Sequence, residues 1–159
     1  MREMINIAIC DDDIVTTSKI ENMLQNIAKR NFIQIDTEVF WNGESLAESV
    51  KAVNYFDIIF LDIEMGAEDG ITVARKIRQI DKNVLIIYVT SHENYMKESF
   101  EVRPFQFLVK PVSERQMECC FQAAYEDISS ADSYFRYNYQ RMNHKIPIND
   151  ILYFESNRR

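Results

Sequence analysis

Acidic, hydroxyl and amino side chains stand directly after four of the short apolar runs in this 159-residue sequence. They are Asp11, Asp12, Asp13, Asp62, Thr90 and Lys110. Neighbouring carboxylates repel one another unless a cation neutralises them, and oxygen ligands without His or Cys suit a hard ion such as Mg²⁺. A lysine and a hydroxyl added to such a cluster could bind a phosphoryl group, with one carboxylate as the nucleophile. The residue types therefore predict a Mg²⁺-dependent phosphoryl-transfer site, provided that the fold brings these run ends together.

Each of these residues also has an ordinary structural interpretation. An aspartate after a strand often caps the next helix, and Asp13 is the best candidate for that role. Thr90 taken alone fits a turn, and Lys110 taken alone fits a solvated charge. Their joint occurrence at four different run ends favours the functional interpretation, because independent coincidences multiply.

The elements that would position these residues follow from the pattern of apolar side chains. Short continuous apolar runs predict buried strands, and apolar residues at helical spacing predict helices between them. Strands are expected at 4–10, 33–40, 56–61, 84–89 and 105–109, and helices at 13–29, 43–53, 71–80, 93–102 and 114–128. Five such β–α pairs predict an α/β fold with a doubly wound, five-stranded parallel sheet. Ligands of such sheets bind beyond the carboxyl ends of the strands, where the residues above would meet.

Composition and charge restrict the classes of function. Hydrophobic residues make up 47% of the chain and only 3 Gly and 3 Pro are present, which argues against disorder. The formal charge is −7, and residues 1–132 hold 13 Lys and Arg against 23 Asp and Glu. Such an acidic segment is a poor non-specific binder of nucleic acid. The three cysteines make no disulfide framework, no signal peptide is visible and the apolar runs are short, so we expect a cytoplasmic protein without membrane contact.

The motifs at the strand ends closely resemble the receiver domain of bacterial two-component response regulators. They are Ile9-Cys10-Asp11-Asp12-Asp13, Leu61-Asp62-Ile63-Glu64-Met65 with Gly70 eight residues after Asp62, Val89-Thr90-Ser91, and Phe107-Leu108-Val109-Lys110-Pro111. The resemblance covers about residues 4–128 and implies a flavodoxin-like strand order, 2-1-3-4-5. Gly66 stands where the family often has Pro, and Ser91 where Ala is common, but neither departure removes a required group.

The resemblance assigns the acidic residues to a metal and phosphoryl site. Asp62 would be the phosphoryl acceptor and would also bind Mg²⁺. Asp11 and Asp12 would form the acidic pair, with Asp12 the more direct ligand of the metal. Glu64 would contribute its backbone carbonyl, so that role does not require its side chain.

The resemblance gives the remaining motif residues roles around the phosphoryl group. Thr90 would hydrogen-bond the phosphoryl group and shift toward it, and Lys110 would pair with it. Phe107 occupies the family's switch position, although an inward aromatic on a strand is an ordinary alternative. The bond between Lys110 and Pro111 is expected to be cis.

The resemblance implies a regulator that is controlled by phosphorylation. It implies no enzymatic activity other than slow removal of the protein's own phosphoryl group. A histidine kinase would donate the phosphoryl group, and a homodimer would form through the fourth helix, fifth strand and fifth helix, near residues 95–107 and 114–125. One alternative is a stand-alone receiver that acts through protein contacts. Another is an aspartyl-phosphate hydrolase, which would require a second aspartate two residues after the nucleophile, where this chain has Glu64.

The segment after the fifth helix has a different character. Residues 129–133 are predicted as a linker from their composition, residues 134–139 alternate like a strand, and a polar turn is expected at 141–144. The stretch Ile151-Leu152-Tyr153-Phe154-Glu155-Ser156 resembles the opening of a LytTR-type DNA-binding domain. This resemblance divides the chain into a receiver at 1–128, a linker, and the truncated beginning of a LytTR-type domain at 134–159. The alternative is an extra hairpin packed on the receiver.

That division makes promoter DNA a partner of the full-length protein only. A LytTR-type domain would need roughly 100 residues, and two or three strands cannot bury a core alone. We therefore expect no sequence-specific DNA binding from residues 134–159.

Overall fold

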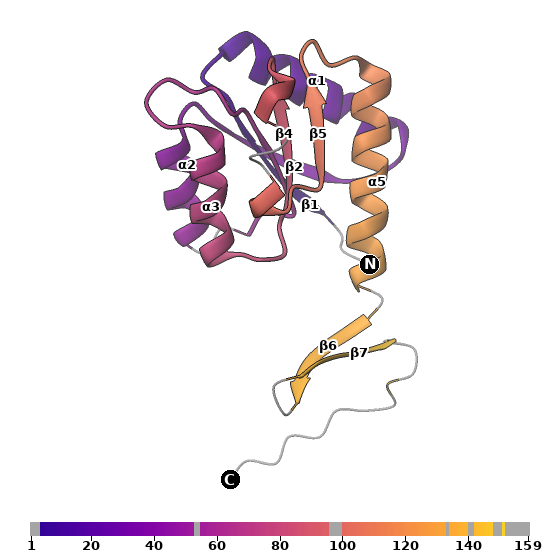
Figure 1. Ribbon diagram of the computed structural model, residues 1–159. Coiled ribbons are helices and arrows are strands. Elements are labelled where there is room, and N and C mark those ends of the chain that lie inside the picture. Colours follow the sequence, from indigo (N-terminus) through magenta and orange to yellow (C-terminus); the bar gives the residue numbers. More distant parts are fainter. Residues whose placement is uncertain are drawn as a thin grey trace.

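Five parallel strands form the centre of the fold, in the order β2-β1-β3-β4-β5 (Figure 1). The computed structural model describes residues 4–52, 55–95, 100–132, 134–139, 142–147 and 151. The strands of the sheet are β1 (Ile5–Cys10), β2 (Ile35–Phe40), β3 (Ile58–Leu61), β4 (Leu85–Thr90) and β5 (Gln106–Val109). The helices that follow them are α1 (Ile14–Arg30), α2 (Gly43–Lys51), α3 (Gly70–Ile80) and α5 (Glu114–Asp132). The predicted α/β class and the strand order 2-1-3-4-5 are confirmed.

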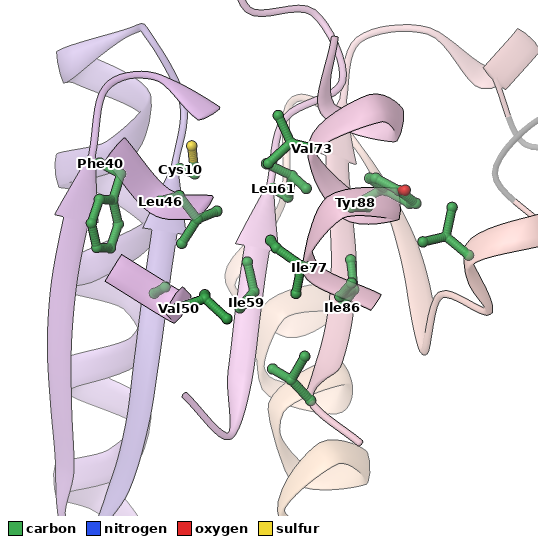
Figure 2. Packing of buried hydrophobic residues seen from close by; sticks show 14 of the residues in the cluster. Cys10, Phe40, Leu46, Val50, Ile59, Leu61, Val73, Ile77, Ile86 and Tyr88 are labelled. Carbon is green, nitrogen blue, oxygen red and sulfur yellow. The ribbon is translucent and has the colours of Figure 1, made fainter. Parts of the chain in front are cut away.

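Two apolar clusters cover the two faces of the sheet. On one face, Leu46 and Val50 of α2 and Ile77 of α3 pack against alternate residues of the strands, as Figure 2 shows. On the other face, buried residues of α1 and α5, among them Leu24 and Phe121, pack against the intervening strand residues. The strands β1, β3 and β4 are buried almost throughout because both faces are covered. This is why their sequences are continuously apolar.

The strand register brings the carboxyl ends of β1 and β3 level with each other, and β4 continues two residues further, to Thr90. Cys10 of β1 pairs with Leu61 of β3, which pairs with Tyr88 of β4. The amide of Asp62 donates to the carbonyl of Cys10 at 2.9 Å, so the residue after β3 lies beside the end of β1. The residues that follow the strands therefore share one edge of the sheet.

Aspartate side chains cap the N-termini of α1 and α3, which begin at this edge of the sheet. The Asp13 carboxylate accepts from the amide of Val15 at 3.1 Å and caps α1, as predicted. Asp69 caps α3 by accepting from the amide and the hydroxyl of Thr72, both at 2.9 Å. Burial would raise the pKa of Asp69, but these hydrogen bonds outweigh it and the pKa lies below the usual value. Each cap satisfies an amide that the first turn of a helix leaves unpaired.

The half-buried guanidinium of Arg78 forms hydrogen bonds with two loops at the other end of the sheet. It donates to the carbonyl of Val84 at 2.7 Å, before β4, and to the carbonyl of Val102 at 2.8 Å, before β5. It also donates to the carbonyl of Arg103 at 3.2 Å. One side chain of α3 thus fixes the entries to two adjacent strands.

Helix α5 extends four residues beyond its predicted end at residue 128. Ser129, Ser130 and the residues through Asp132 are helical, so the segment 129–132 does not end the helix. The Ser130 hydroxyl donates to the carbonyl of Asp127 at 2.9 Å, which lets a serine sit in the last turns of a helix. Residue 133 lies outside the described residues.

The helix expected at 93–102 is only partly within the described chain. The described residues at its ends form two 3₁₀ turns, η1 (Glu93–Tyr95) and η2 (Phe100–Val102), and residues 96–99 lie outside the description. No helix in the described part of the chain is long and apolar enough to cross a bilayer.

A two-stranded antiparallel hairpin follows α5. It consists of β6 (Tyr134–Tyr139) and β7 (Met142–Pro147), and it lies beyond the end of α5, apart from the five-stranded sheet (Figure 1). The predicted strand at 134–139 is confirmed. The predicted turn at 141–144 is wrong for Met142 to His144, because these residues pair with β6 in the register Tyr139 with Met142. Of the motif 151–156, only Ile151 lies within the described residues.

Candidate phosphoryl-transfer site

An ammonium group and two buried carboxylates form the centre of the carboxyl edge. Lys110, after β5, places Nζ 2.7 Å from Oδ2 of Asp11 and 3.0 Å from Oδ2 of Asp62. Both carboxylate side chains are almost fully buried, and the lysine side chain is 19% exposed. Residues from three strand ends, far apart in the sequence, therefore meet in one polar site.

A third carboxylate, that of Asp12, lies beside the two buried ones and is exposed to solvent. Oxygen atoms of Asp11, Asp12 and Asp62 all lie within 4.8 Å of one another, and Asp12 is exposed. The donor set consists of oxygens alone, which fits a hard divalent cation such as Mg²⁺. The structure thus brings together three of the four predicted ligands, Asp11, Asp12 and Asp62, and an ion could reach them from the side of Asp12.

The charges of the site are unbalanced. Burial raises the pKa of Asp62, and the neighbouring Asp11 adds to that effect, while Lys110 opposes it. Burial would lower the pKa of Lys110, but its hydrogen bonds to Asp11 and Asp62 outweigh burial and raise it. One ammonium cannot neutralise three carboxylates, so a divalent cation would relieve the repulsion that remains.

Thr90 lies at the end of β4 in the same region. It is fully buried, and among the described side chains its hydroxyl is one of two buried hydroxyls without a hydrogen-bond partner. The amide of Lys110 donates to the Thr90 carbonyl at 2.8 Å, which holds the two residues side by side. Thr90 therefore lies beside Lys110, with a buried hydroxyl that could still donate a hydrogen bond.

Phe107 and the proline after Lys110 complete the predicted set. Phe107 is half-buried on β5, and its ring lies 5.9 Å from the ring of Tyr88, its partner on β4. Because Phe107 packs on the apolar cluster rather than on the acidic centre, a role in switching stays a prediction. The peptide bond between Lys110 and Pro111 is cis, which agrees with the geometry that the resemblance implies.

Two glycines shape the loop between β3 and α3. Gly66 has φ of +41°, a conformation that glycine adopts without strain. A Cβ at Gly70 would lie 2.0 Å from the carbonyl oxygen of Asp62, so α3 approaches the acceptor residue more closely than any side chain permits. The amide of Gly70 donates to the carbonyl of Ile63 at 2.8 Å and closes the loop. This contact explains why glycine stands eight residues after Asp62.

The side chain of Glu64 has contacts that the sequence did not predict. Its carboxylate lies 3.1 Å from Nε2 of His92 and accepts from the Tyr95 hydroxyl at 3.3 Å. The sequence motifs predict only a backbone role for Glu64 and no role for His92 or Tyr95 in this site. No spacing rule links residues of two loops, so the signal was absent from the sequence.

Comparison with known proteins identifies the family to which this fold belongs. Residues 7–121 match the family model of the response regulator receiver domain. The chain belongs to this family. Among curated proteins, the receiver is similar to the transcriptional regulatory protein LytR of Staphylococcus aureus strain N315, with 29% identity over 69% of this chain and 43% of that protein. It is also similar to the sensory transduction protein LytT of Oceanobacillus iheyensis, with 31% identity over 79% of this chain and 50% of that protein.

Solved structures of receiver domains have the same fold as this chain. The response regulatory domain of protein mrkE from Klebsiella pneumoniae superposes with a TM-score of 0.71 at 21% identity, over 79% of this chain and 99% of that chain. The receiver domain of sensor histidine kinase PA1611 from Pseudomonas aeruginosa PAO1, described with a magnesium ion in its active site cleft, superposes with a TM-score of 0.66 at 20% identity, over 76% and 97% of the two chains. At these identities the likeness concerns the fold alone. The chain spans about half the length of the curated relatives it matches.

Proposed function

We propose that this receiver accepts a phosphoryl group on Asp62 from a histidine kinase and thereby controls a transcriptional regulator. The observation that carries the proposal is the position of Lys110, whose ammonium bridges the carboxylates of Asp11 and Asp62 at the mouth of an oxygen-only cluster. A lysine with only a structural role would not need to contact two carboxylates that follow two different strands.

The residues present can perform the transfer as an in-line displacement. A carboxylate oxygen of Asp62 attacks the phosphorus of the donor phosphohistidine, the new O–P bond forms, and the P–N bond breaks. The electron pair of that bond stays on the imidazole nitrogen of the donor, which then takes a proton. Lys110 and the Thr90 hydroxyl would bind oxygens of the transferred group, which is how phosphoryl transfer is chiefly stabilised.

Asp11, Asp12, Asp62 and the backbone carbonyl of Glu64 would hold Mg²⁺. The bound ion would neutralise charge on the phosphoryl oxygens. The Lys110 ammonium donates to Asp11 and to Asp62 and so fixes the two carboxylates relative to each other.

The output of the phosphorylated state would be a dimer. New charge at Asp62 would draw the Thr90 hydroxyl, and Phe107 and the face near residues 95–107 and 114–125 would rearrange with it. The names of the LytR and LytT relatives support a transcriptional role, in which residues 134–159 begin a LytTR-type domain that binds promoter DNA in the cytoplasm. A stand-alone receiver that acts through protein contacts is the alternative.

The proposal is tested by intact-mass measurement after incubation with a small phosphodonor such as acetyl phosphate. We expect the mass to rise by one phosphate only when Mg²⁺ is present, and the Asp62→Asn variant not to be labelled. Asp57→Asn is the matched control, because Asp57 is also buried but precedes β3 at the opposite end of that strand. Labelling of Asp62→Asn at the wild-type level would refute the assignment.

The same sample tests the non-enzymatic role. Released phosphate measured over hours should not exceed what slow self-dephosphorylation of the labelled chain produces. Rapid multiple turnover would instead support an aspartyl-phosphate hydrolase.

A further inference from the structure

A bridge of three side chains joins two loops beside the acidic centre. The Glu64 carboxylate, in the loop after β3, accepts from the Tyr95 hydroxyl at 3.3 Å through Oε1 and lies 3.1 Å from Nε2 of His92 through Oε2. The rings of His92 and Tyr95 meet edge to face with centroids 6.4 Å apart. The bridge therefore spans from the loop that carries the acceptor to the turn η1 after β4.

The loop on one side of this bridge is closed by the backbone hydrogen bond from Gly70 to Ile63, but its contact at Glu64 is long. The amide of Glu64 lies 3.3 Å from Oδ1 of Asp62, a long hydrogen bond, and Gly66 two residues later is a conformationally free position. Tyr95 on the other side is half-buried, and its ring packs against the apolar cluster of α2 and α3. The bridge thus connects the loop after β3 to a ring that packs on the apolar core.

We propose that Tyr95 is a positioning residue for the cation site. Acting through Glu64, its hydroxyl would hold the loop after β3, which carries two of the groups that would bind the ion, Asp62 and the carbonyl of Glu64. His92 contacts the same Glu64 carboxylate. This inference rests on the proposed function, because it requires a divalent cation at the acidic cluster.

The coupling must act in both directions. If the contact between Glu64 and Tyr95 favours the ion-binding geometry, a bound ion must by linkage favour that contact. The turn η1 would then respond to occupancy of the site by a route separate from Thr90, through the side chain of Glu64. The contact is half-exposed and long, so it can open and close without unfolding the loop.

The first test is Mg²⁺ binding to the full chain, measured by titration calorimetry. Tyr95→Phe keeps the packed ring and removes only the hydroxyl, and we expect its affinity to fall roughly two- to tenfold, the effect of one net hydrogen bond. Tyr55→Phe is the matched control: Tyr55 is 72% exposed and precedes β3 at the opposite edge, so its affinity should not change.

A double-mutant cycle with Glu64→Ala separates positioning from charge. The loss of a carboxylate weakens cation binding by itself, so only the effect of Tyr95→Phe in the two backgrounds is compared. We expect Tyr95→Phe to lower the affinity in the wild type and to change nothing in Glu64→Ala. Equal losses in both backgrounds would overturn the inference.

Hydrogen exchange gives a readout that does not depend on affinity. In the wild type, amides of residues 92–95 should exchange more slowly at saturating Mg²⁺ than without Mg²⁺. In Tyr95→Phe, Mg²⁺ should not slow them. An equal Mg²⁺-dependent slowing in both proteins would contradict the inference. If the wild type binds no Mg²⁺, the proposed function fails. If the wild type binds and Tyr95→Phe binds equally well, only the positioning role fails.

Discussion

Substituting Gly70 with alanine should damage both the stability of the receiver and its phosphoryl acceptor. The added Cβ would lie 2.0 Å from the carbonyl oxygen of Asp62 and 2.9 Å from its carbonyl carbon. Real Cβ atoms do not approach such atoms within 3.0 Å, so the backbone of Asp62 or the start of α3 must move by about 1 Å. No side-chain rotation can relieve a clash with backbone atoms.

The expected magnitude follows from two opposing effects. Overpacking in a well-packed region costs about 1–3 kcal/mol or more, and the better helix propensity of alanine returns at most about 1 kcal/mol. We expect Gly70→Ala to lose about 2 kcal/mol of unfolding free energy in urea titration. Its phosphorylation rate should fall roughly 100-fold, because a 1 Å displacement of a reacting group has effects of that size.

Gly43→Ala provides a matched comparison. Its Cβ would lie 2.1 Å from Cγ2 of Val73, which is a side-chain atom. Adding Val73→Ala removes the clashing methyl and should recover part of the stability that Gly43→Ala loses. A Gly70→Ala variant with wild-type stability and a wild-type labelling rate would refute the close approach of α3 to Asp62.

Three further predictions concern the scaffold. Arg78→Ala should lower the unfolding free energy by about 2–3 kcal/mol, because the carbonyls that Arg78 binds lose a charged donor. Arg78→Lys should not restore the stability, since lysine lacks the guanidinium fork. Equal stability of the arginine and lysine proteins in urea would contradict this. Asp69→Ala should cost about 1 kcal/mol at neutral pH. Since the folded pKa of Asp69 lies below its usual value, the charge contribution is present above the usual value near 3.8 and is lost as the pH falls through the folded pKa; Asp69→Asn should show no such loss. A maleimide should label the native chain at Cys119 alone, because Cys119 is exposed while burial raises the pKa values of Cys10 and Cys120 to about 12; mass measurement of Cys119→Ser should then show no labelling.

The edge of the sheet that holds the site could be predicted because strand ends are visible in a sequence. Apolar runs end at Cys10 and Leu61, and a parallel sheet brings the residues after them to one edge. The same placement puts Lys110, after β5, at this edge, where it contacts Asp11 and Asp62. Periodicity and position were sufficient for this part of the site.

The loop contacts could not be predicted because they depend on side-chain directions that have no period. The bridge from Glu64 to Tyr95 and the carbonyls held by Arg78 join residues of separate loops. The end of α5 was missed for a related reason: Ser130 suggests a turn by composition, but its hydroxyl bonds back to the carbonyl of Asp127 and the helix continues.

We expect Asp62, and neither Asp11 nor Asp12 beside it, to accept the phosphoryl group. An acyl phosphate reacts with hydroxylamine to leave a hydroxamate on the aspartate and release phosphate, so the acceptor can be located after proteolysis by peptide sequencing in a mass spectrometer. We predict that the chain labelled in the presence of Mg²⁺ carries the hydroxamate on Asp62 alone. A hydroxamate on Asp11 or Asp12, or none at all after confirmed labelling, would contradict this account of the site.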